Sequence, residues 1–273
     1  MIGSSQILLQ AAAGVNLESG WDVSKAVYVR SLFVGGTTGF GLSDMALSYD
    51  GTKLYVLTLV NDYIYQWNLS TAWDISTASY SQSLYVRNQD GSPSGINFKD
   101  DGTKLYITGY DNDKVYEYGL STAWNVSTGS YSQSFSVASQ EDIPSALYIG
   151  SSGSKLYVVG NTNDTVYEYG LSTAWDVSTA SYSQGFSIAS QDNLPVGLFF
   201  KEDGTKMYFI GSQNNRVYEY DLSTAWDVST ASYSKNVSIA TKGTNPAGMY
   251  IGDAGSKLYW LDGGNRSVFQ YDL

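Results

Sequence analysis

A repeat of 51 residues runs through this chain of 273 residues. Four tryptophans and all four prolines keep this interval: Trp73, Trp124, Trp175 and Trp226, and Pro93, Pro144, Pro195 and Pro246. Residues 171–184 and 222–235 are identical at 13 of 14 positions. A repeat of this length is typical of architectures in which similar units stack on one another or close into a ring.

Each unit contains four short runs with the pattern of β-strands. The first run follows the proline and ends at an Asp-Gly pair such as Asp203-Gly204, which favours a hairpin because glycine accepts a positive φ. The second run begins at a lysine, and the third alternates, as in Val217 to Tyr220. The fourth is rich in serine and suits a half-exposed edge strand. The unit is therefore predicted to be a four-stranded antiparallel sheet.

The repeat is circularly permuted relative to the chain: the chain starts with a fourth strand and ends with a third strand. The first three strands occur five times and end at Tyr271, whereas the first copy of the fourth strand, Tyr28 to Val34, lies near the N-terminus. This arrangement predicts an all-β, five-bladed β-propeller in which the N-terminal strand closes the last blade. An open stack of the same units is the alternative, but the terminal copies lack the polar caps it would need. Residues 18–273 would form this single domain, and residues 1–17 would be an attachment segment or a disordered terminus.

Two resemblances follow from these residues. The segment from Pro195 through Asp203-Gly204-Thr205 to Tyr220 resembles the YVTN-type propeller repeats, over about residues 21–273. That family implies the fold, and it includes surface-layer proteins and lactonase-like enzymes, so it implies no single function. The LSTAWDVSTASYSQ connector is similar to repeats in structural proteins of tailed bacteriophages and in bacterial surface proteins.

The composition excludes several classes of function. The chain has neither cysteine nor histidine, so thiolate chemistry, disulfides and imidazole catalysis or ligation are excluded. A net charge of −11 would repel nucleic acid over most of the surface. No apolar run is long enough for a membrane span, and no basic residue precedes the short apolar stretch at residues 7–13, so no secretory signal is recognisable.

Residues present in every copy are interpreted as architecture. The five tryptophans, Trp21 included, would pack as plugs under the connector between the third and fourth strands. The Tyr-x-Tyr pairs of the third strand would pack between blades. Lysines at the start of the second strand would form cross-strand ion pairs with third-strand glutamates, as for Lys104 and Glu117.

Residues that differ between copies mark the predicted binding surface. In a four-stranded meander, the loops between strands two and three and those between blades emerge on one face, which we call the variable face. The opposite face, with the Asp-Gly turns and the connectors, is called the constant face. Loops on a rigid scaffold commonly carry binding residues, so individuality is expected to be confined to the variable face.

Asp44 is one of two asymmetries on this face. It stands where the other copies have glycine or alanine, and Leu42 and a longer loop ending at Phe40 accompany it. Either this carboxylate contacts a ligand or ion at the mouth of the channel, or it adjusts the blade that follows ring closure.

The run Asp111-Asn112-Asp113 is the second asymmetry, and it lacks the spacing of a complete calcium loop. A solvated turn is therefore expected there, and neither a metal nor a cofactor is predicted. Asparagines with nearby aromatic rings are compatible with sugars. The candidate ligand-binding residues are Phe40, Asp44, Asp62, Tyr110, Asp111, Asp113, Asn163, Asp164, Asn214, Asn215, Asn265 and Arg266.

Three functions remain open. The leading hypothesis is a non-enzymatic structural or recognition module on a virion or an extracellular surface, most of all in a bacteriophage capsid or tail, with protein subunits as partners. A lectin-like propeller that binds surface glycans is the alternative. A lactonase-like hydrolase is the third, which without histidine would have to rely on Asp44 with a cation or Arg266.

Overall fold

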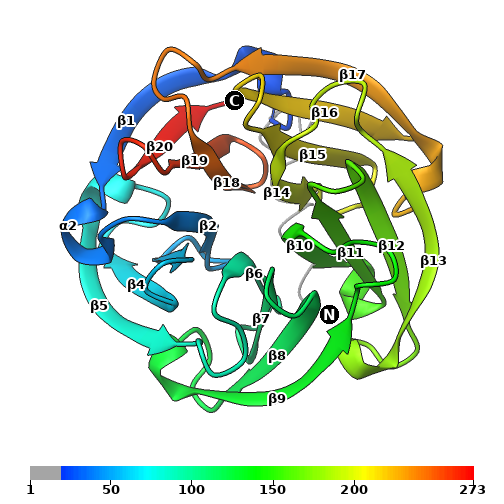
Figure 1. The fold of residues 1–273 in the computed structure, drawn as a ribbon. Coiled ribbons are helices and arrows are strands. Elements are labelled where there is room, and N and C mark those ends of the chain that lie inside the picture. Colours follow the sequence, from blue (N-terminus) through cyan, green and yellow to red (C-terminus); the bar gives the residue numbers. More distant parts are fainter. Residues whose placement is uncertain (1–19) are drawn as a thin grey trace, which may run out of the picture.

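The computed structural model describes residues 20–273, which form five four-stranded antiparallel sheets arranged around a central channel (Figure 1). The first blade contains β2 (Leu42–Leu47), β3 (Lys53–Thr58), β4 (Tyr63–Leu69) and β5 (Ala78–Tyr85). The second contains β6 (Pro93–Phe98), β7 (Lys104–Gly109), β8 (Lys114–Leu120) and β9 (Gly129–Ser136). The third contains β10 (Pro144–Gly150), β11 (Lys155–Gly160), β12 (Thr165–Leu171) and β13 (Ala180–Ser187). The fourth contains β14 (Pro195–Phe200), β15 (Lys206–Gly211), β16 (Arg216–Leu222) and β17 (Ala231–Ser238).

The fifth blade joins the two ends of the described chain. Its inner strands are β18 (Pro246–Gly252), β19 (Lys257–Asp262) and β20 (Ser267–Asp272), and its outermost strand is β1 (Val27–Phe33). In Figure 1, β1 in blue lies alongside β20 in red, and the two pair from Val27↔Asp272 to Phe33↔Ser267. The five-bladed closed ring is confirmed, and the open stack is wrong. The expected attachment segment, residues 1–17, lies outside the described residues.

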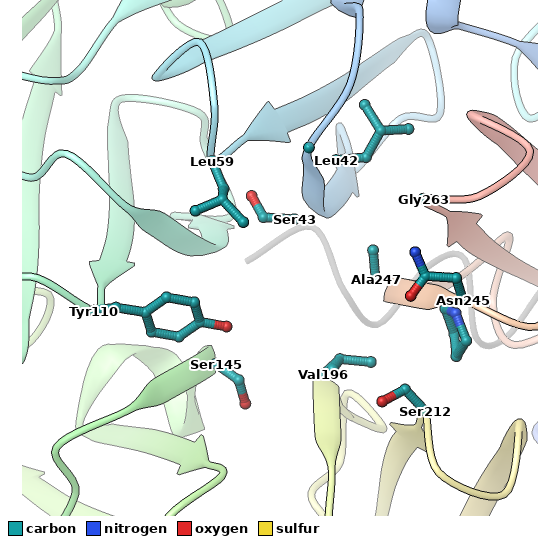
Figure 2. A pocket seen from close by; sticks show the side chains of 12 residues that line it. Leu42, Ser43, Leu59, Tyr110, Ser145, Val196, Ser212, Asn245, Ala247 and Gly263 are labelled. Atoms are coloured by element: carbon teal, nitrogen blue, oxygen red, sulfur yellow. The ribbon is translucent and has the colours of Figure 1, made fainter.

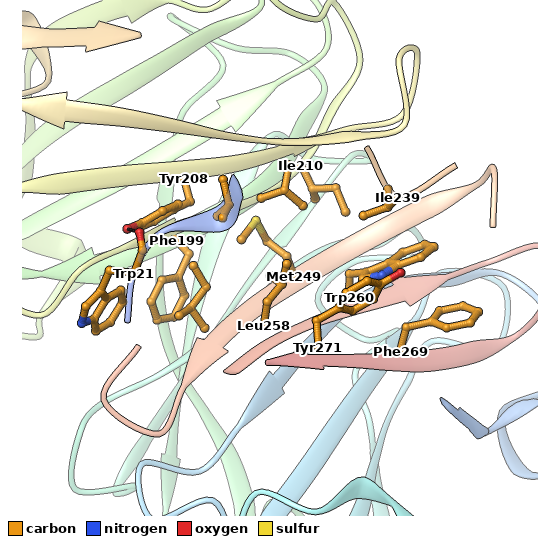
Figure 3. Close-up of a cluster of buried hydrophobic side chains, with 13 residues drawn as sticks. Trp21, Phe199, Tyr208, Ile210, Ile239, Met249, Leu258, Trp260, Phe269 and Tyr271 are labelled. Carbon is orange, nitrogen blue, oxygen red and sulfur yellow. Dashed lines mark hydrogen bonds between the residues drawn. The ribbon is translucent and has the colours of Figure 1, made fainter. Parts of the chain in front are cut away.

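The hydrophobic core lies between the blades rather than at one centre. Buried residues fall into five clusters, and each draws on two neighbouring blades. Figure 3 shows one of them, where Phe199 and Tyr208 of the fourth blade meet Met249 and Trp260 of the fifth. Each sheet thus buries both faces, which is why its inner strands are apolar almost throughout.

A repeated set of hydrogen bonds joins each blade to the next. The second-strand tyrosine donates its hydroxyl to the carbonyl oxygen of the next blade's tryptophan at 2.6 to 2.8 Å, from Tyr55 onward. A third-strand side chain, such as Glu117, accepts the N–H of the short 3-10 turn that follows this tryptophan, here Val177 at 3.2 Å. Lys104 Nζ lies 2.6 Å from Glu117 Oε1, and the same pair recurs at Lys155–Glu168 and Lys206–Glu219, so the expected ion pairs are confirmed in three blades.

The five tryptophans have an uncommon backbone conformation for a bulky residue. Their φ angles are 63 to 71°, in the left-handed region. Each indole ring covers the glycine of the turn in its own blade: a Cβ on Gly51 would lie 2.2 Å from the ring of Trp73. Trp21 is buried and the other four are half-buried. The plug interpretation is therefore supported, with the ring on the constant face.

No helix in residues 20–273 is both long and apolar enough to cross a membrane.

Candidate functional site

The central channel opens on the variable face in a cavity of about 270 Å³ (Figure 2). Its walls come from the first residues of the inner strands and from the loops above them, including Ser43, Tyr110, Ser145, Val196 and Asn245. Figure 2 shows these residues around the mouth, each from a different blade. Equivalent positions of the repeat contribute different groups to this one cavity, as Leu59, Tyr110, Ser212 and Gly263 do.

The hydroxyl of Ser43 is free among these groups. The equivalent hydroxyls of Ser94 and Ser145 donate to the carbonyl oxygens of Pro144 and Pro195 at 2.5 and 2.6 Å. Ser43 Oγ is buried and has no hydrogen-bond partner within residues 20–273. It is thus an unsatisfied hydroxyl beside the cavity, in contrast to its equivalents in the next two blades.

Tyr110 brings its ring into the same mouth from the loop of the second blade (Figure 2). Burial raises the pKa of Tyr110 to about 12, and the nearby Asp44 contributes to the shift. The phenol is therefore protonated at neutral pH and can act as a hydrogen-bond donor to a ligand.

Asp44 lies deeper, among the inner strands. Its Oδ2 accepts the N–H of Ile96 in the next blade at 2.9 Å, and its Oδ1 accepts the N–H of Met45 at 2.7 Å. A Cβ on Gly248 would lie 2.0 Å from Oδ1, so the carboxylate fills the space that this glycine leaves. Burial holds the pKa of the Asp44 carboxyl well above its usual range, although the two N–H groups oppose the shift. This geometry supports adjustment of the blade after ring closure more than contact with a ligand.

The asparagines among the candidates connect loops. Asn163, Asn214 and Asn265 each donate from Nδ2 to a backbone carbonyl of the preceding loop between blades, at 2.8 to 2.9 Å. Asn61 and Asn112 do the same at 2.9 and 3.1 Å. The bond recurs in all five blades, so these amide groups serve the scaffold.

The next residue in each of these loops has a positive φ. Asp62, Asp113, Asp164, Asn215 and Arg266 have φ angles of 47 to 57°. Their carbonyl oxygens accept the N–H that follows the outermost strand, as Asp113 does from Val137 at 2.8 Å. Aspartate and asparagine tolerate this conformation better than most residues. At this loop position the backbone carbonyl therefore has the same role in all five blades, whereas the side chain differs between them.

The side chains at this position have different surroundings. Asp62 is buried and pairs with Arg87 at 2.7 Å. Burial raises the pKa of Asp113, with Asp142 and Asp90 adding to the shift, and burial and Asp192 raise the pKa of Asp164. Asp111 is exposed beside them. Within residues 20–273, no three acidic side chains come together in a way that could hold a metal ion.

Arg266 forms the most individual feature of the rim. Its Cζ lies 4.5 Å from the ring centroid of Phe40 and 5.3 Å from that of Phe33. Phe40, Phe33 and the neighbouring Val60 are exposed by 69, 58 and 61%. We call these four residues the aromatic rim. Of the candidates, the structure places Phe40 with Arg266 in this rim, Tyr110 at the mouth and Asp44 in β2, and the others lie in the loops between the second and third strands of their blades.

Sequence reasoning missed a set of buried carboxylates that fasten the loops. Asp192 accepts the N–H groups of Leu194 and Asn214 at 3.0 and 2.9 Å, while Asp90 and Glu141 act in the same way in their blades. In the fifth blade this position is Gly243, and Asp262 provides the carboxylate from β19 instead. An acidic residue at a fixed repeat position after the fourth strand was the available signal.

Comparisons with known proteins support the fold. No protein-family model matches the chain, and no curated protein matches it. A functionally unknown protein from Desulfotomaculum acetoxidans is 13% identical with a TM-score of 0.50, and the match covers 82% of this chain and 63% of that one. A protein from Bacteroides uniformis, provisionally named a 6-phosphogluconolactonase, is 11% identical with a TM-score of 0.52. The match covers 83% of this chain and 65% of that one.

A third similar structure is matched over nearly its full length. The β-propeller domain of Cps50 (Swd1) from Myceliophteria thermophila is 9% identical with a TM-score of 0.51, and the match covers 91% of this chain and 99% of that domain. This chain spans less than two thirds of the other two proteins. At these identities the likeness shows the propeller fold alone. The resemblances to YVTN-type repeats and to phage connectors stay predictions.

Proposed function

We propose that this chain is a non-enzymatic recognition module on the surface of a particle or cell, and we favour a bacteriophage virion as its setting. The aromatic rim is the observation that carries this proposal. Exposed aromatic rings flanking an arginine are the residue types that dominate binding energy at protein interfaces. Phe40 is the most exposed large apolar side chain among residues 20–273.

At the variable-face end of the channel, the surroundings of Asp44 and Asp192 support binding rather than catalysis. Asp44 and Asp192 are buried and accept backbone N–H groups. A general base needs a carboxylate that faces the substrate. A hydrolase of the lactonase kind would have to work without these groups.

We further propose a protein subunit as the partner, in preference to a glycan. Sugar recognition relies on free amide and carboxylate groups, and the five loop asparagines have already committed their amides to backbone carbonyls. Residues 1–17 would serve attachment to the same assembly.

The test compares rim and control variants in binding to the proteins encoded by neighbouring genes and to a glycan array. Phe40→Ala combined with Arg266→Ala should weaken binding to one protein at least tenfold, since each such residue commonly contributes more than about 1 kcal/mol. Tyr131→Ala combined with Tyr182→Ala removes exposed rings from the outer strands and should leave affinity unchanged.

Three outcomes would contradict this proposal. One is saturable glycan binding that the rim variant abolishes, which would favour the lectin. Another is turnover in a lactone and ester screen, which would favour the hydrolase. The third is equal loss of affinity in both double variants, which would remove the rim from the interface.

A further inference from the structure

The channel has a second and larger cavity at its other end, on the constant face. Its volume is about 630 Å³, which is within the range of pockets that bind small organic ligands. It is built from the ends of the inner strands, the Asp-Gly turns and three of the tryptophans. This end of the channel is separate from the aromatic rim and from Ser43 and Tyr110.

Aromatic rings form much of the wall of this cavity. The ring of Phe199 lies 5.3 Å from that of Tyr148 and 5.1 Å from that of Tyr250, between centroids. Trp21 stacks on Phe199 at 6.3 Å, and the two lie side by side in Figure 3. Phe98 and Trp124 continue the wall at 5.4 Å from each other. The hydroxyls of Tyr148 and Tyr250 have no hydrogen-bond partner among the described residues.

Acidic side chains surround the same space. Asp100, Glu202 and Asp253 occupy equivalent positions in three blades, each just before the turn, and all three line the cavity. The adjacent lysines form their ion pairs with the following aspartates: Lys99 pairs with Asp101 at 2.7 Å and Lys201 with Asp203 at 2.8 Å. Their charges oppose the pKa shifts of Asp100 and Glu202 without reversing them. Neither Asp100 nor Glu202 has an ion-pair or hydrogen-bond partner within residues 20–273.

The negative charge of Asp100 reaches Glu202 across the channel. Burial raises the pKa of Asp100, and the neighbouring Asp101 adds to the shift. Burial likewise raises the pKa of Glu202, and Asp100 contributes to it. Glu202 is also the main cause of the raised pKa of Tyr49, ahead of burial and Asp100. A positive charge between these groups would relieve the repulsion and favour their ionised forms.

The combination of aromatic walls and free carboxylates defines a class of ligand. Ring faces attract cations, and quaternary ammonium groups are bound in proteins by cages of such rings. A metal ion fits less well, because no three acidic groups of the described chain converge closely enough to coordinate one. We infer that the constant-face cavity is a binding site for a small organic cation with an alkylammonium group.

A matched pair of ligands tests the charge. Choline and 3,3-dimethyl-1-butanol have nearly the same shape, and only choline is charged. Isothermal titration, with tryptophan fluorescence as a second readout, should give at least about tenfold tighter binding of choline, since cation–π contacts and free carboxylates act on the charge alone. Equal affinities, or no saturable binding of choline at millimolar concentration, would overturn the inference.

Variants then locate the site. Asp100→Asn combined with Glu202→Gln should weaken choline binding about tenfold, because the attraction between unlike charges is lost. Tyr49→Leu, at an exposed edge of the constant-face cavity, should weaken choline binding severalfold. Asp111→Asn makes the same type of charge change on the variable face and should leave the affinity within twofold. Melting curves show whether each variant is folded, and choline binding that survives the acidic double variant would place the cation elsewhere.

The aromatic rim provides the last control. Phe40→Ala combined with Arg266→Ala should leave choline binding unchanged. A loss in that variant would overturn the assignment to the constant face, whereas the proposed recognition function would remain open.

Discussion

At the scale of single residues, the tryptophans show how one conformation can be repeated in every copy. A bulky side chain in the left-handed region is costly by itself. It is retained because the ring covers the turn glycine of its own blade while its carbonyl accepts a tyrosine hydroxyl from the preceding blade. The recurrence of tryptophan was evident from the sequence, but its backbone conformation was not.

Truncating one of these rings should destabilise the protein. Trp124→Ala removes the contacts with Phe98 and with the turn at Gly102, and it should lower the free energy of unfolding by about 3 kcal/mol. Tyr131→Ala, at an exposed position of the next strand, should change it by less than about 0.5 kcal/mol. Urea denaturation of both variants measures the difference, and equal effects would argue against the plug.

Asp44 should make stability depend on pH. Because burial raises its pKa in the folded state, the folded protein keeps this proton to a higher pH than the unfolded chain does. Stability is therefore highest below the unfolded pKa and falls as the pH rises towards the folded pKa.

Asp44→Asn removes that titration. The free energy of unfolding of the variant relative to the wild-type protein should rise with pH above about 4, by about 1.4 kcal/mol for each unit of the shift. Urea denaturation from pH 4 to 8 provides the measurement. Parallel pH profiles for the two proteins would show that Asp44 is ionised throughout.

At the scale of elements, a single buried carboxylate holds two loops of the variable face together in a blade, because it accepts N–H groups from both. Asp192 faces Gly211 in the fourth blade, whereas in the fifth Gly243 faces Asp262. The two arrangements exchange the same pair of residue types between a loop and the strand opposite. The effect on stability of a substitution at one of these positions should therefore depend on the residue at the other.

This exchange gives a double-variant prediction. Asp262→Gly leaves the N–H groups of Asn245 and Asn265 without their acceptor, and Gly243→Asp places a Cβ 2.2 Å from Asp262 Oδ2. Each single variant should be destabilised, and the double variant should recover at least about 2 kcal/mol relative to their sum. Thermal or urea unfolding of the four proteins gives the coupling energy, and simple additivity would contradict the shared role.

Elements also explain why the second cavity was not expected. The prediction that individuality is confined to the variable face is wrong, because the residue before the turn of the constant face changes between copies, with four residue types in five blades. These residues are Tyr49, Asp100, Ser151, Glu202 and Asp253. A neighbouring set on the inner strands also differs: Ala46, Asn97, Tyr148, Phe199 and Tyr250. Most of these residues line the cavity.

At the scale of the whole molecule, closure depends on a segment that is far from its neighbours in sequence. Trp21 accepts the hydroxyl of Tyr208 at 2.7 Å, and Val23 donates to Glu219 at 3.2 Å. Within the ring, the same bonds join blades that the chain already connects. Only at this junction do they hold a strand, β1, that no hairpin joins to the strand beside it, in addition to its pairing with β20.

A matched pair of variants tests this difference. Tyr208→Phe and Tyr55→Phe remove the same type of bond, at 2.7 Å in both cases. Only Tyr208→Phe should speed hydrogen exchange of the β1 amides, by about fivefold for a bond of about 1 kcal/mol, since local opening there costs less than global unfolding. Exchange in β13 serves as the internal reference, because the bond from Tyr106 to Trp175 ahead of that strand is intact in both variants. Equal protection of β1 in both variants would mean that strand pairing alone closes the ring.

The sequence by itself determined the number of blades, the strands of each blade and the position of the closing strand. These follow from a local pattern that recurs along the chain, so each copy confirms the others. Only the tertiary structure decided which side chains meet. Residues 51 positions apart converge on one channel after the ring has closed. Hydrogen bonds with the backbone then occupy some polar side chains: Asp44 accepts an N–H group and Asn214 donates to a carbonyl oxygen, whereas Asp100 and Glu202 stay free.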